Sequence, residues 1–143
     1  MTIKMRIAAV TGSVALMLAA TIADARTMGY KCVLSGVDGT DWIQPLVFIG
    51  HDEANERVTV SDGAILTFND GQPIEGRVIR ANDKRITFGW LLVAQSATNQ
   101  KVRMRYRATY VRGTGVFTMT AQPTGYSNMF NRKGSCDVAE IKR

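Results

Sequence analysis

The feature that most restricts the fold of this chain is a segment of strict alternation with a glycine turn, residues 101–121. A β-strand sends successive side chains to opposite faces, so the first arm of this segment has one apolar face and one basic face. The basic face consists of Lys101, Arg103, Arg105 and Arg107. Gly113 and Gly115 can adopt the positive φ angles that a tight turn needs. The segment therefore predicts a β-hairpin with one buried face and one row of cations.

A two-residue turn at Gly113 and Thr114 would also set the register of this hairpin. The pairs expected from that turn are Tyr110 with Phe117, Ala108 with Met119, and Arg107 with Thr120. Both arms then agree on which face is buried. We refer to Lys101, Arg103, Arg105 and Arg107 as the basic row.

The first 25 residues have the pattern of a secretory signal peptide. Lys4 and Arg6 precede an uncharged apolar stretch, residues 7–22, and the small-x-small sequence that follows ends at Ala25. This pattern predicts cleavage after Ala25 and a location in the periplasm or outside the cell. A retained membrane anchor is the alternative, but the apolar stretch is shorter than the roughly 20 residues that a span requires. We expect residues 26–143 to form a single domain with no transmembrane segment after cleavage.

The two cysteines, Cys32 and Cys136, lie near opposite ends of that domain. In an oxidising compartment, an isolated pair of this kind indicates one structural disulfide. A disulfide requires the two α-carbons to lie within about 7 Å of each other. The first and last strands of the domain are therefore expected to be neighbours.

Residues 26–143, with the hairpin included, read as about nine short β segments separated by turn signals. Residues 64–68 are counted among the strands, residues 51–56 are interpreted as a hairpin loop, and residues 85–93 place four large residues on one face. Those four are Ile86, Phe88, Trp90 and Leu92. A meander whose first and last strands meet is a closed barrel. The predicted fold class is therefore all-β, a small antiparallel up-and-down β-barrel closed by one disulfide, with a β-sandwich as the alternative.

Catalytic chemistry has little support in the sequence. His51 is the only histidine, which excludes a metal site built from several histidines, and no nucleophile motif accompanies it. No glycine-rich loop opens a helix to hold a phosphate. We predict a non-enzymatic protein without catalytic residues, metal or cofactor, in which His51 is a solvated loop residue.

The charge of the chain favours an anionic partner. Residues 101–143 hold nine basic and two acidic side chains, whereas residues 26–100 hold seven basic and nine acidic ones. The basic row is the candidate anion-binding site, and a merely solvated strand face is the alternative. Arginine suits carboxylate and phosphate groups, so an anionic envelope component or an acidic protein would fit. Nucleic acid is not expected, because no aromatic residue interleaves with the cations on that face.

Two further functions remain as alternatives. A small barrel can hold an apolar ligand, although the large inward residues expected here would fill one. The Tyr30-Lys31-Cys32 sequence near the expected mature start, with a terminal disulfide, is loosely similar to bacterial lysozyme inhibitors of the membrane-bound type. That resemblance implies a periplasmic enzyme inhibitor. It covers a few residues only, and the Ser-Gly-containing inhibitory segment of that family has no counterpart in this sequence.

Overall fold

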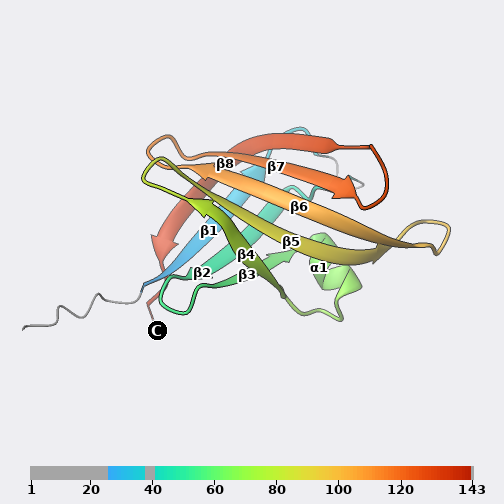
Figure 1. Ribbon diagram of the computed structural model, residues 1–143, viewed down its shortest axis with the longest axis horizontal. Helices are drawn as coiled ribbons and strands as arrows, with labels where there is room; N and C mark the ends of the chain where they lie inside the picture. Colours follow the sequence, from blue (N-terminus) through green and yellow to red (C-terminus); the bar gives the residue numbers. More distant parts are fainter. Residues whose placement is uncertain (1–25, 38–40, 143) are drawn as a thin grey trace, which may run out of the picture.

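The computed structural model describes residues 26–37 and 41–142, which form a closed antiparallel β-barrel of eight strands (Figure 1). The elements are β1 (Thr27–Leu34), β2 (Leu46–Asp52), β3 (Arg57–Asp62), α1 (Gly63–Phe68), β4 (Ile74–Ala81), β5 (Arg85–Gln95), β6 (Lys101–Val111), β7 (Val116–Pro123) and β8 (Phe130–Glu140). Each strand pairs with its neighbours in sequence, and β8 returns to pair with β1. The predicted up-and-down barrel is therefore confirmed. The predicted signal peptide, residues 1–25, lies outside the described residues.

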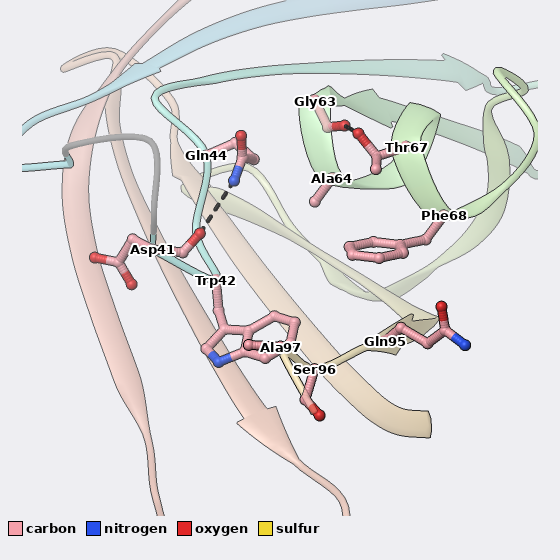
Figure 2. A pocket seen from close by; sticks show the side chains of 10 residues that line it. All are labelled: Asp41, Trp42, Gln44, Gly63, Ala64, Thr67, Phe68, Gln95, Ser96 and Ala97. Carbon is pink, nitrogen blue, oxygen red and sulfur yellow. Dashed lines mark hydrogen bonds between the residues drawn. The ribbon is translucent and has the colours of Figure 1, made fainter. Parts of the chain in front are cut away.

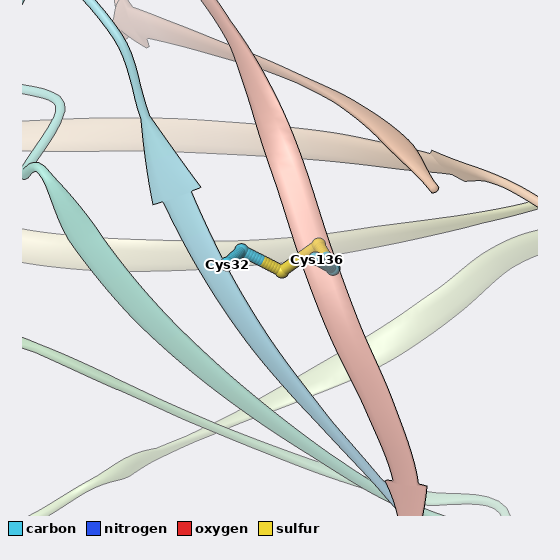
Figure 3. Close-up of a disulfide and its surroundings, with 2 residues drawn as sticks. All are labelled: Cys32 and Cys136. Atoms are coloured by element: carbon cyan, nitrogen blue, oxygen red, sulfur yellow. A yellow bond between two sulfur atoms is a disulfide. The ribbon is translucent and has the colours of Figure 1, made fainter. Parts of the chain in front are cut away.

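The barrel closes where β1 meets β8, and the disulfide lies at this junction (Figure 3). Cys32 and Cys136 are directly opposite each other in the register, with their α-carbons 4.0 Å apart. Gly134, which lies two pairs from the disulfide and opposite Leu34, permits the close approach of the two strands. A Cβ atom at Gly134 would lie 1.8 Å from the carbonyl oxygen of Val33. The predicted disulfide and the predicted neighbourhood of the first and last strands are both confirmed.

We expect removal of this disulfide to lower stability substantially. The bond spans a sequence separation of 104 residues, and loop-closure entropy for a loop of that size corresponds to roughly 4–5 kcal/mol. The Cys32→Ala/Cys136→Ala variant should therefore unfold at a clearly lower urea concentration than the wild type. Reduction of the wild type should produce the same shift, and reductant should leave the variant unchanged. A midpoint that is equal in all four samples would show that strand pairing alone closes the barrel.

The β6–β7 hairpin has the register that the sequence predicted. Tyr110 pairs with Phe117, Ala108 with Met119, and Arg107 with Thr120. Gly113 and Gly115 have φ angles of 84° and 75°, which a residue with a side chain rarely adopts. The turn chemistry and the alternation of the two arms thus specify the same pairing.

Large side chains occupy the interior of the barrel. Phe88, Tyr106 and Phe117 are fully buried, and Trp90 stacks on Tyr106 with ring centroids 5.5 Å apart. The Tyr106 hydroxyl donates a hydrogen bond of 2.8 Å to the carbonyl oxygen of Trp42, in the connection between β1 and β2. The predicted inward face of residues 86–92 is therefore part of the core.

One predicted strand, residues 64–68, is instead the helix α1. Asp62 ends β3 in an extended conformation and caps the helix, because its Oδ1 accepts a hydrogen bond of 2.8 Å from the Ile65 backbone N–H. Ile65 is fully buried, so α1 packs onto one end of the barrel between β3 and β4 (Figure 1). A segment of five residues is too short for periodicity to separate strand from helix. The cap and the burial of Ile65 decide the outcome.

The cap predicts different effects for two substitutions of Asp62. Asp62→Ala removes the acceptor for the Ile65 N–H and should cost about 1–2 kcal/mol. Asp62→Asn keeps an acceptor oxygen at that place and removes a carboxylate whose pKa is raised by burial. It should therefore match the wild type or exceed its stability at neutral pH. Urea denaturation of both variants tests this, and equal losses in the two would contradict the capping role.

Candidate anion-binding face

The basic row lies on the outer face of β6. Met104, Tyr106 and Ala108 alternate with its cations and are buried in the core, so the side chains between them must point outward. All four cations of the row are exposed. Residues two apart on a strand are about 7 Å apart, so three arginines and a lysine form one continuous line. The predicted basic face is therefore present, and its anion-binding role remains a hypothesis.

No acidic side chain neutralises this row within the described part of the chain. The two ion pairs found there join Arg57 to Glu75 and Arg132 to Asp41. The sequence has no aspartate or glutamate between Asp83 and Asp137, which covers β5, β6 and β7 completely. Cations that stand about 7 Å apart without partners repel one another, and salt screens that repulsion over a Debye length of about 8 Å. A bound anion would remove the repulsion.

A shallow groove borders the row on the β5 side. It has a volume of about 500 Å³ and runs over β4, β5 and β6. Its lining includes Arg77, Arg105 and Arg107 together with the apolar side chains of Ile79 and Leu91. Glu75 also lines it, and its carboxylate is held 2.9 Å from the Arg57 guanidinium. The groove therefore offers guanidinium groups beside an apolar surface.

The sequence interpretation missed this apolar surface. Alternation in β5 predicted that Phe88, Trp90 and Leu92 are buried, which implies that Leu91 and Val93 face outward. That implication was available from residues 85–95. To predict that Leu91 and Val93 lie directly beside the arginines, the β5–β6 register is also needed, and only the tertiary structure gives that register.

A second hollow, of about 450 Å³, lies at the barrel end that α1 covers (Figure 2). It is formed by the connection before β2, by α1 and by the end of β5 with the following loop. Figure 2 shows Trp42 and Phe68 on two of its walls, with Gln44 donating a hydrogen bond of 3.0 Å to the carbonyl oxygen of Asp41. The basic row does not line this hollow. Any ligand there would contact aromatic and amide groups instead of cations.

The prediction that His51 is a solvated loop residue is wrong. β2 extends through Asp52, so His51 lies within a strand, opposite Met28 on β1 and Val58 on β3. Its ring meets Phe88 edge-on at a centroid distance of 5.9 Å. Its Nδ1 is buried and has no hydrogen-bond partner among the described residues. The polar residues after His51 suggested a loop, but strand pairing on both sides extends β2 by two residues.

The environment of His51 predicts a pH-dependent stability. Burial lowers the pKa of His51 below its ordinary value of 6.5, and the nearby carboxylate of Glu53 opposes this in part. The unfolded chain then binds a proton more readily than the folded one, so stability falls as pH drops below about 6.5. His51→Phe should remove that fall between about pH 7 and pH 5, as measured by urea denaturation. The same comparison, made in the Asp62→Asn background, excludes a contribution from the buried Asp62 carboxyl group. A pH profile of stability that His51→Phe leaves unchanged would contradict the assignment.

Within residues 26–37 and 41–142, no group of three or more histidine, cysteine, aspartate or glutamate side chains is arranged to hold a metal ion. In the same residues, no helix has the length and apolar character needed to cross a bilayer. Comparisons of the chain with protein-family models, curated proteins and solved structures found no significant match.

Proposed function

We propose that this protein is an exported, non-enzymatic binding module that uses the basic row on β6 to hold an anionic partner. The observation that carries the proposal is a line of one lysine and three arginines, all exposed, on a sheet face with no acidic residue on β5, β6 or β7. Guanidinium groups form paired hydrogen bonds with carboxylate and phosphate oxygens. The partner is an anionic component of the cell envelope or an acidic protein.

Export is part of the proposal. The signal-peptide pattern of residues 1–25 supports it, with cleavage after Ala25 and release to the periplasm or the outside. The Cys32–Cys136 disulfide fits an oxidising compartment, because such bonds are rare where thiols are kept reduced. A module in that compartment meets the anionic polymers and lipids of the envelope.

Single-stranded nucleic acid is a poorer partner for this face. Proteins that hold single strands without sequence preference add aromatic rings on which bases stack. Tyr106, the aromatic residue between Arg105 and Arg107, is buried with its ring stacked on Trp90. The row therefore offers charge without a stacking platform between its cations.

The proposal predicts salt-sensitive retention on immobilised heparin, used as an anionic probe. Arg103→Glu/Arg105→Glu/Arg107→Glu should abolish this retention, because it replaces three adjacent cations by anions. The matched control is Lys31→Glu/Lys84→Glu/Lys142→Glu, which changes the net charge equally at three exposed, scattered positions. It should elute at a moderately lower salt concentration than the wild type.

Both variants must first show the wild-type circular dichroism spectrum and melting temperature, since the substituted side chains are exposed. Equal loss of retention in the two variants would mean that net charge alone binds heparin. Unchanged retention in the β6 variant would refute the row as a binding site.

A further inference from the structure

An exposed apolar row runs along β5 beside the basic row. Leu91 lies opposite Arg105, and Val93 lies opposite Arg103, in the β5–β6 register. Leu91 and Val93 are 53% and 50% exposed. Neighbouring strands are about 4.8 Å apart, so each of these aliphatic side chains lies beside the side chain of an arginine.

Ile79 extends this apolar row onto β4. The pairing of β4 with β5 shifts between Val78 and Arg80, and Ile79 has no partner in the register. Its side chain lies over Gly89, because a Cβ at Gly89 would come 2.6 Å from the Ile79 Cδ1. Gly89 is opposite Arg107. The absence of a side chain at Gly89 thus lets Ile79 reach the neighbourhood of the basic row.

The other side of the basic row also has exposed apolar residues. Arg105 also lines a separate small hollow of about 90 Å³ together with Pro123 and Tyr126, at the end of β7. Tyr126 is 66% exposed, and Met129, in the same β7–β8 loop, is 56% exposed. The arginines therefore lie between two groups of exposed apolar side chains.

We propose that this face, made by β4, β5, β6 and the β7–β8 loop, docks on the surface of an anionic lipid bilayer. This inference rests on the proposed anion-binding function and names the partner class. A soluble acidic polymer would pair with the arginines and leave Leu91, Val93 and Tyr126 in water. The headgroup region of a bilayer supplies anions at the surface and an apolar boundary directly beneath them. It satisfies both kinds of side chain at once.

A second exposed apolar patch on the barrel serves as a control for this proposal. Val33, Leu46 and Phe48 form another exposed apolar patch on β1 and β2, with Val33 opposite Leu46. In the closed ring of eight strands, β2 and β6 are four positions apart and lie on opposite sides. Among the described residues that pair with this patch, the only cation is Lys31, which lies opposite Phe48. The patch matches the β5 row in exposure and lacks a row of arginines.

Sedimentation with lipid vesicles tests the proposal. The purified protein should bind vesicles of phosphatidylcholine mixed with phosphatidylglycerol and should not bind phosphatidylcholine alone. Leu91→Ser/Val93→Ser should weaken binding to the mixed vesicles about tenfold, because two half-exposed aliphatic side chains lose their apolar contact. The control Val33→Ser/Leu46→Ser should bind within about twofold of the wild type. Heparin retention should be the same in both variants.

Fluorescence gives a second measurement that does not depend on affinity. Val93→Trp should be quenched by lipids brominated in the acyl chain, whereas Phe48→Trp should not be. Each of these variants adds one indole to the same native background, so the difference between the two reports the docked face.

The outcomes separate the two proposals. If heparin retention depends on the arginines but the protein does not bind vesicles, the proposal of bilayer docking is wrong and the anion-binding function remains. Vesicle binding that Leu91→Ser/Val93→Ser leaves unchanged, or equal quenching of Val93→Trp and Phe48→Trp, would also overturn the bilayer docking. A wild-type protein that binds neither heparin nor vesicles would overturn both proposals.

Discussion

The pairing of β1 with β8 is the constraint on which the rest of this structure depends. It converts a meander of eight strands into a closed ring, so that no described strand is left with an unpaired edge. The Cys32–Cys136 bond joins residues directly opposite each other at this junction, and Gly134 lets the two backbones approach there. Closure also encloses the interior, which is what allows the aromatic side chains of β5, β6 and β7 to be buried together.

Closure has a direct consequence for the outer surface. Because side chains alternate along a strand, a one-residue slip of β6 would exchange its buried and exposed sets and would place arginines in the core. Burial of Met104, Tyr106 and Ala108 therefore holds the basic row outside. The packing of the core and the outward position of the cations are two results of the same register, so burial of the interior side chains also fixes the side of the sheet on which the proposed binding surface lies.

The two proposals use different parts of one surface. The arginines alone account for affinity toward anions. Because β5, β6 and β7 carry no acidic residue, binding would relieve repulsion within the row. The aliphatic side chains on β5 contribute nothing to that affinity. Their exposure beside the row becomes understandable if both meet a surface that is anionic outside and apolar beneath. The patch on β1 and β2 shows that exposed aliphatic residues also occur on this barrel without arginines, so the combination on β5 and β6 is the informative feature.

The sequence by itself determined the hairpin and the disulfide, and it favoured a closed barrel over a β-sandwich. Strict alternation, a glycine turn and a cysteine pair are local or countable signals, and each has few structural solutions. It could not determine the secondary structure of residues 64–68, where the Asp62 cap and the burial of Ile65 favour a helix over a strand. It also misplaced His51, because pairing with β1 and β3 extends β2 into a polar segment. The position of Leu91 beside Arg105 and of Ile79 over Gly89 depended on inter-strand register and on an irregularity in β4. Such contacts join residues distant in sequence, so only the tertiary structure decided them.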